Sequence, residues 1–164
     1  MEDLREQIQD QEITIVGNES EWVISIKKDD LFNEVSARSM YFVKNNSKEP
    51  VTSDSNVILD DDRNLCNIYM ENAMQELLSA LARRIKEDAV VNDATDFTMT
   101  LTMGGNHDEN LLGPLKVACK EYLVKRILEQ WFNGDMGSIA EYARITHLLQ
   151  YRKKSPSRRV RPLL

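Results

Sequence analysis

The sequence predicts a mainly helical fold, a bundle of about four helices with a small β element made of an N-terminal hairpin and a strand near residues 96–103. Three observations predict it. Apolar residues recur at helical spacing over several long stretches, two β-branched runs flank a Gly-Asn turn near the N-terminus, and one segment alternates strictly between apolar residues and threonine. With 164 residues, 41% of them hydrophobic and 29% charged, one globular domain is expected.

Composition divides the chain into three parts. A polar N-terminal segment covers residues 1–11, a single helical domain covers residues 12–149, and a basic tail covers residues 150–164. Within the domain, a loop is expected at residues 45–60, because this stretch is rich in Asn, Ser, Asp and Pro. Its length indicates a working surface loop or an interface arm rather than a simple connection.

The first half of the domain is expected to form a hairpin and two helices. Residues 13–16 (ITIV) and 22–26 (WVISI) flank the turn and predict two antiparallel strands. A helix is expected from about residue 30 to 45, capped by Asp29 or Asp30. A second helix is expected to open at residues 60–62 (DDD) and to reach about Glu87, with basic residues in its last turns.

The second half begins with the strand signal DFTMTLTM at residues 96–103, which places four apolar side chains on one face and three threonines on the other. A helix capped by Asn106 or Asp108 is then expected from about residue 109 to 133. It is apolar almost all round, so it should be buried on most sides. Pro114 falls in its first turn, where proline is tolerated. Ser138 is expected to cap a last helix that reaches Leu149.

Two cysteines, Cys66 and Cys119, lie far apart, each within an apolar helical pattern. Buried free thiols in a reducing, cytosol-like compartment are therefore expected rather than a disulfide or a metal pair. The N-terminus, MEDLREQIQDQE, has no apolar core typical of a secretory signal. No stretch approaches the roughly 20 apolar residues that a membrane helix needs, so no membrane partner is expected.

Motifs for catalysis or metal binding are weak. Gly104-Gly105-Asn106-His107 lacks the spacing of a dinucleotide loop and the Gly-Lys-Ser/Thr of a P-loop. The run His107-Asp108-Glu109 points its side chains in different directions, and residues 60–62 lack the pattern of an EF-hand. No nucleophile elbow is present. A non-enzymatic protein without a cofactor or a metal is expected.

The aromatic residues Trp22, Trp131 and Phe132 fit either core packing or a subunit interface, where tryptophan is enriched. Core packing is the simpler interpretation.

Charge is distributed unevenly along the chain. Residues 1–149 carry 15 basic and 27 acidic residues, a net charge of −12, whereas residues 150–164 (QYRKKSPSRRVRPLL) carry six basic residues and no acid. An acidic body argues against nucleic-acid binding over the whole surface. The tail itself fits three interpretations: a solvated terminus, an arm that contacts nucleic acid, or an arm that docks on an acidic face of a neighbouring copy.

Docking on a neighbouring copy is favoured, because apolar residues are mixed with the charges and these can fill a groove on a protein. The expected docking residues are Arg152, Lys153, Lys154, Arg158, Arg159, Val160, Arg161, Leu163 and Leu164.

The order of features over residues 96–164 resembles small virion structural proteins of tailed phages and prophages of gut Bacteroidetes-type bacteria. The resemblance is carried by FTMTLTM, the Gly/Asn turn, EYLVKRILEQWF, AEYARITHLLQYR and RRVRPLL, with weaker support from residues 29–84. It implies a head–tail connector, neck or tail-completion protein that forms a ring of identical subunits.

That resemblance also implies partners and a location. The expected partners are identical subunits, the portal protein, and tail or neck proteins, and DNA would pass without specific binding. The expected location is the virion, after synthesis in the cytoplasm of the bacterial host. The alternative is a small nucleic-acid-binding or regulatory protein that uses the basic tail.

Overall fold

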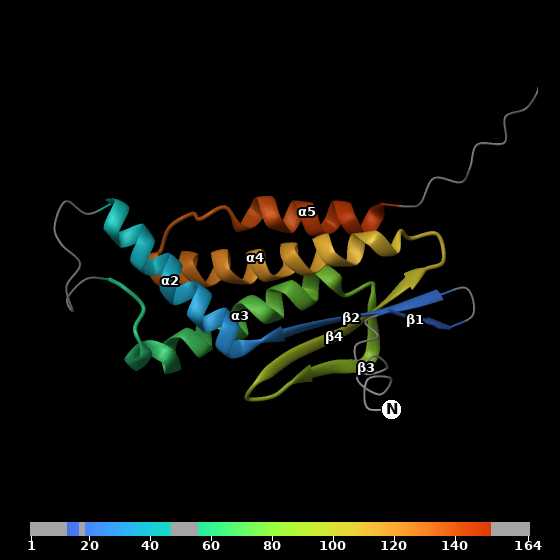
Figure 1. Cartoon of the computed structure of the whole chain (residues 1–164), viewed down its shortest axis with the longest axis horizontal. Helices are drawn as coiled ribbons and strands as arrows, with labels where there is room; N and C mark the ends of the chain where they lie inside the picture. Colours follow the sequence, from blue (N-terminus) through green and yellow to red (C-terminus); the bar gives the residue numbers. More distant parts are fainter. Residues whose placement is uncertain (1–12, 17–18, 47–55, 152–164) are drawn as a thin grey trace, which may run out of the picture.

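The computed structural model describes residues 13–16, 19–46 and 56–151 of the chain (Figure 1). A four-stranded antiparallel sheet carries a layer of helices on one of its faces. The strands are β1 (Ile13–Val16), β2 (Glu19–Lys27), β3 (Ile85–Asn92) and β4 (Asp96–Gly104). The helices are α2 (Lys28–Asn46), α3 (Arg63–Leu81), α4 (Leu112–Phe132) and α5 (Ser138–Gln150), with short 3-10 turns η1 (Asp60–Asp62) and η2 (Glu109–Leu111). The mainly helical class with a small β element is thereby confirmed.

The sheet has the strand order β1-β2-β4-β3. In the antiparallel register Trp22 lies opposite Leu101, and Ile26 lies opposite Phe97, so these side chains share one face. Alternate residues of β2 and β4 on that face are buried against the helices. The opposite face carries the threonines, and the hydroxyls of Ser25 and Thr98 lie 3.0 Å apart there. The alternation in residues 96–103 therefore predicted both the strand and its buried face.

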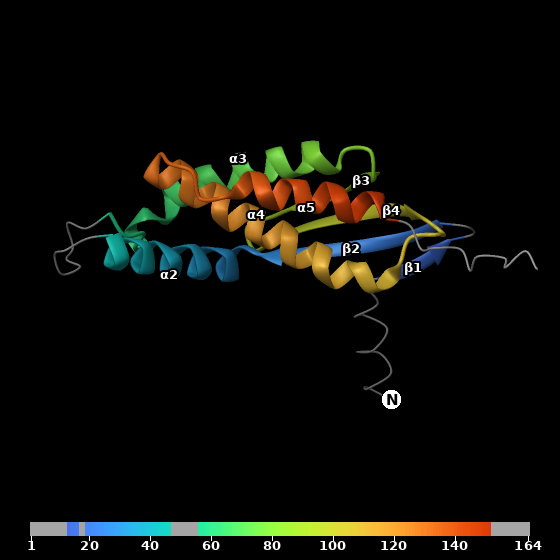
Figure 2. The same cartoon turned by 90° about the horizontal axis from the view of Figure 1, so that it is seen from above.

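Helix α4 is the centre of the helical layer. It contacts α2 and α3, reaches the sheet at β2, and carries α5 on its outer side (Figures 1 and 2). Its packing against these four elements explains why so much of its sequence is apolar, although Val117 is exposed. Cys66 and Cys119 are free and buried, as predicted. Burial raises the pKa of the Cys66 thiol to about 11 and that of Cys119 to about 12.

The prediction of a helix reaching Glu87 was wrong. α3 ends at Leu81, and residues 85–92 form the edge strand β3. This segment pairs with β4, which places Ile85 and Val90 opposite the buried Leu101 and Met99. A register shift between Ile85 and Val90 breaks the period of two that would otherwise signal a strand.

The caps of the helices also differ in part from the prediction. Asp29 and Asp30 lie in the first turn of α2, which begins at Lys28. Asp108 caps η2, as expected, by accepting a hydrogen bond from the amide of Asn110. Ser138 does not cap α5: Gly137 holds that position with a φ of 88°, and the Ser138 hydroxyl binds elsewhere. Over the ranges that the structure describes, no helix is long and apolar enough to cross a membrane.

Candidate functional site

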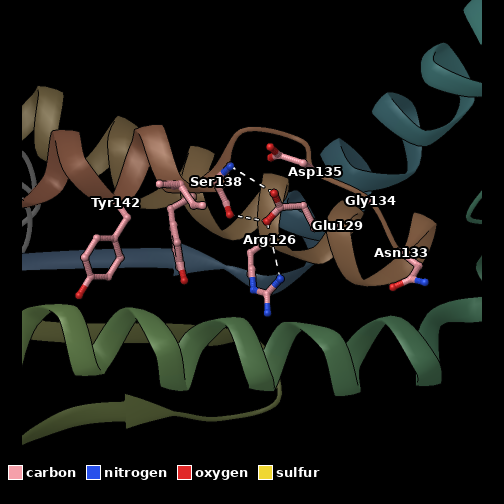
Figure 3. A pocket seen from close by; sticks show the side chains of 9 residues that line it. Arg126, Glu129, Asn133, Gly134, Asp135, Ser138 and Tyr142 are labelled. Atoms are coloured by element: carbon pink, nitrogen blue, oxygen red, sulfur yellow. Dashed lines mark hydrogen bonds and ion pairs between the residues drawn. The ribbon is translucent and has the colours of Figure 1, made fainter.

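A surface pocket of about 630 Å³ opens where the end of α4 meets the loop into α5 (Figure 3). Helix α4 supplies one wall, the connecting loop a second, and the first turns of α5 a third. The lining residues are Tyr122, Arg126, Glu129, Asn133, Gly134, Asp135, Ser138, Ile139 and Tyr142.

Glu129 is the central acid of this pocket. Its side chain is buried, and one carboxylate oxygen accepts a hydrogen bond from the Met136 amide at 2.9 Å. The Ser138 hydroxyl donates to the other oxygen (Figure 3). Burial alone raises the pKa of Glu129, but the hydrogen bonds from Ser138 and Met136 outweigh it and the pKa lies below its ordinary value. Glu129 therefore stays charged and fixes the loop between α4 and α5.

Arg126 extends this network from α4 to α3. Its Nε donates to Glu76 at 2.7 Å, and its Nη1 lies 3.7 Å from Glu129. The Tyr122 hydroxyl donates to Glu76 at 3.0 Å. The Arg126 hydrogen bond lowers the pKa of Glu76, whereas burial and this acceptor raise the pKa of Tyr122. One network of side chains thus joins α3, α4 and α5.

The main polar side chains of the pocket are bonded to other groups of the protein. Its lining holds no histidine or cysteine. Its serine hydroxyl donates to a carboxylate whose low pKa makes it a weak base. Arg126 is already paired with Glu76, so little of its charge remains for a bound anion. The arrangement stabilises the packing of three helices.

Only one signal for this network is present in the sequence: Glu129 stands among apolar residues on the face of α4 that is otherwise buried. Its donors come from residues 136–138 in the next loop, and Glu76, the partner of Arg126, comes from α3. Spacing along the chain does not show such contacts between elements.

His107 is buried in a structural position. Its Nδ1 lies 3.1 Å from the Gly104 carbonyl oxygen, and its Nε2 lies 3.0 Å from that of Leu149. The ring therefore joins the turn after β4 to the last turn of α5. Asp108 caps η2 and Glu109 is exposed, so the run of residues 107–109 forms no ligand set.

The other weak motifs have structural roles as well. A Cβ built on Gly104 would lie 3.3 Å from Asn106 Oδ1, so a residue larger than glycine would crowd this side chain. Asp62 accepts a hydrogen bond from the Leu59 amide at 2.9 Å. Among the described residues, no group of three or more His, Cys, Asp or Glu side chains is arranged to hold a metal ion.

The large aromatic residues pack within the subunit. Trp22 is 1% exposed and lies in the core. Trp131 is partly buried, and its Nε1 donates to the Asn56 carbonyl at 2.9 Å. The ring of Phe132 lies 4.5 Å from that of Phe42 between centroids. Core packing is confirmed for Trp22, while Trp131 and Phe132 hold the end of α4 against its neighbours.

A second surface stands out on the first turns of α3. Leu65 and Ile68 point outward and are 42% and 57% exposed. Asp60 and Asp61, in η1, are exposed beside them. We call these four residues the α3 outer surface. Leu65 and Ile68 are two of several large apolar side chains that are exposed among the described residues, and here two acids precede them in the chain.

The tail residues expected to dock lie outside the described residues. These are Arg152, Lys153, Lys154, Arg158, Arg159, Val160, Arg161, Leu163 and Leu164. The structure does show where the tail begins. α5 ends at Gln150, next to the exposed Tyr151, at the opposite end of the long axis from η1 (Figures 1 and 2).

Comparisons of the chain with models of protein families, with curated proteins and with solved structures found no match.

Proposed function

We propose that this chain is a non-enzymatic structural protein of a phage particle, a head–tail connector or neck component whose copies form a ring. The division of charge carries the proposal: a net charge of +6 on residues 150–164 against −12 on residues 1–149. The C-terminal tail of each copy docks on the acidic body of the next copy, through charge-assisted hydrogen bonds and apolar contacts.

The position of the tail fits a head-to-tail ring. The tail starts at one end of the molecule, so a tail that binds the far end of a neighbour joins two different surfaces. Contacts of this head-to-tail kind form rings when the rotation between copies closes. The networks that join α3, α4 and α5 give the subunit the rigidity that such an assembly needs.

The assignment to a phage rests on the resemblance of residues 96–164 to virion structural proteins. On that basis the further partners are portal, neck or tail proteins, and the protein resides in the virion after synthesis in the host cytoplasm. DNA passes through the ring without specific binding.

Truncation of the tail tests the proposal. We expect the full chain to form a high-order oligomer in native mass spectrometry, and a variant that ends at Gln150 to fold normally but to stay monomeric. A variant of full length in which the six tail Lys and Arg residues are replaced by Gln should also be monomeric, because the docking depends on charge. Normal assembly of the truncated variant would overturn the docking role of the tail.

A gel-shift titration distinguishes the alternative of a nucleic-acid-binding tail. Binding through phosphates weakens steeply as salt is added, because each neutralised phosphate releases counterions. We expect no complex with double-stranded DNA or RNA at physiological salt. A salt-sensitive complex that the truncated variant does not form would replace the assembly proposal with the nucleic-acid one.

A further inference from the structure

We infer that the α3 outer surface is the docking site for the C-terminal tail of a neighbouring copy. The inference rests on the proposed function, and it adds the residues that receive the tail. Arginines of the tail pair with Asp60 and Asp61, while Val160, Leu163 and Leu164 cover Leu65 and Ile68.

The apolar part of this surface is unpartnered in the subunit. The opposite side of α3 is buried in the core through Cys66, Met70 and Ala73, so the helix is already anchored without Leu65 and Ile68. These two side chains lie about one turn apart on the outward face. Covering them removes apolar area from water, which stabilises a complex.

The acids of this surface are available for a cation. Several other helix carboxylates in the described ranges form ion pairs: Asp29 with Arg63, Glu121 with Arg38, and Glu141 with Lys125. No ion pair or side-chain hydrogen bond is found for Asp60 or Asp61 within the described part of the chain. Their position at a helix start also stabilises α3, so they serve the fold as well as the contact.

The tail combines basic residues with apolar residues, and the α3 outer surface combines acidic residues with apolar residues. Residues 158–164 read RRVRPLL, in which three arginines are followed or interrupted by apolar residues. A segment that mixes arginine with valine and leucine complements a surface that mixes aspartate with leucine and isoleucine, whereas a phosphate backbone offers no partner for the apolar residues.

Distance favours a neighbouring copy over the tail's own subunit. The bond from His107 to the Leu149 carbonyl places the end of α5 beside the start of α4. The bonds from Trp131 to Asn56 and from Gln130 to Tyr69 place the start of α3 beside the end of α4.

The length of α4 therefore separates the two points. A helix of 21 residues spans about 32 Å at 1.5 Å per residue. Arg158 lies seven residues beyond Tyr151, so a fully extended chain carries it at most about 25 Å. Arg158 and, one residue on, Arg159 therefore fall short of the α3 outer surface of their own subunit, whereas Arg161, ten residues beyond Tyr151, can span the distance.

Charge reversal tests the inference. We expect the double variant D60K/D61K to weaken assembly of the full chain roughly tenfold or more, because two attractive contacts become repulsive. The double variant R158E/R159E should weaken it equally. Combining all four substitutions should restore assembly at least in part, because the opposite charges face each other again. Sedimentation velocity measures the change, and added salt should weaken the wild-type assembly.

A matched control carries the same change of charge at the other end of the molecule. E19K/E109K replaces two exposed acids near the start of β2 and at η2, and assembly should be unchanged. Circular dichroism and thermal unfolding check that each variant folds. The milder pair D60N/D61N replaces D60K/D61K if the lysines unfold α3.

The outcomes separate this inference from the proposed function. If the variant ending at Gln150 is monomeric while D60K/D61K assembles normally, the tail docks elsewhere: the inference is overturned and the proposed function stands. If the wild-type chain stays monomeric at every concentration tested, both are overturned. Loss of assembly in D60K/D61K, with recovery in the fourfold variant, supports both.

Discussion

Glu129 is the residue on which the attachment of α5 depends most directly. It is the only acid of α4 whose side chain is buried, and donors from the loop and from α5 converge on its two oxygens. A buried carboxylate with several donors is stable, but removing the charge leaves those donors without an adequate acceptor. At this position both the amide and an apolar residue should therefore destabilise the protein.

We predict that Glu129→Gln lowers the free energy of unfolding at pH 7 by about 1–3 kcal/mol, because the new amide group faces donors instead of accepting from them. Urea unfolding followed by circular dichroism measures the change. The control Glu109→Gln alters an exposed acid of η2 and should shift stability by less than about 0.5 kcal/mol. Equal effects of the two substitutions would contradict the role given to Glu129.

The stabilities of the wild type and of Glu129→Gln should respond differently to acid. The pKa of Glu129 is lower in the folded protein than its ordinary value of 4.5, so its stabilisation is fully present above pH 4.5. It is lost as the pH falls through the lower folded value. The stability difference between wild type and Glu129→Gln should therefore narrow below pH 4.5. A difference that stays constant from pH 7 to pH 3 would show that the charge is not responsible.

At the scale of elements, periodicity decided what could be predicted from the sequence. β4 keeps a strict period of two over residues 96–103, and both its existence and its buried face followed from that pattern. β3 was missed because a bulge interrupts its period, and because Arg83, Arg84 and Lys86 fit the end of a helix equally well. Only its pairing with β4 makes residues 85–92 a strand.

Asp88 lies between Ile85 and Val90, where the register of β3 shifts, and has a left-handed φ of 58°. We predict that Asp88→Val destabilises the protein by about 1–2 kcal/mol, because a β-branched residue is strained in that conformation. Asp88→Gly should be neutral or slightly stabilising. Thermal unfolding compares the two variants. In a regular strand the order would be reversed, since valine favours strands and glycine weakens them, so greater stability of the valine variant would refute the bulge.

The candidate sites were less predictable than the elements. In the weak motifs at residues 60–62 and 104–109, the side chains of Asp62, Asp108 and His107 make hydrogen bonds within turns and caps. The network of Glu76, Arg126 and Glu129 could not be foreseen, since its members come from separate elements. The α3 outer surface was also missed, because Leu65 and Ile68 fit the apolar pattern that predicts a core.

At the scale of the whole molecule, the subunit has two different ends. The basic tail begins beside the end of α5, and the α3 outer surface lies at the far end of the long axis (Figure 1). The networks between the helices hold these two ends in a fixed relation. If these two ends are complementary, as we propose, copies join head to tail and close as a ring when the rotation between them closes.

The central claim is that the tail of one copy binds the α3 outer surface of the next. Mixing two variants, each of which lacks one side of this contact, tests it most directly. The variant ending at Gln150 keeps the α3 outer surface but lacks the tail, and full-length D60K/D61K keeps the tail but lacks the surface. Each should be monomeric alone in native mass spectrometry. An equimolar mixture should give a 1:1 complex and nothing larger, because only one intact contact is available to each pair. A mixture that stays monomeric, or a tail-less variant that forms rings by itself, would contradict the account.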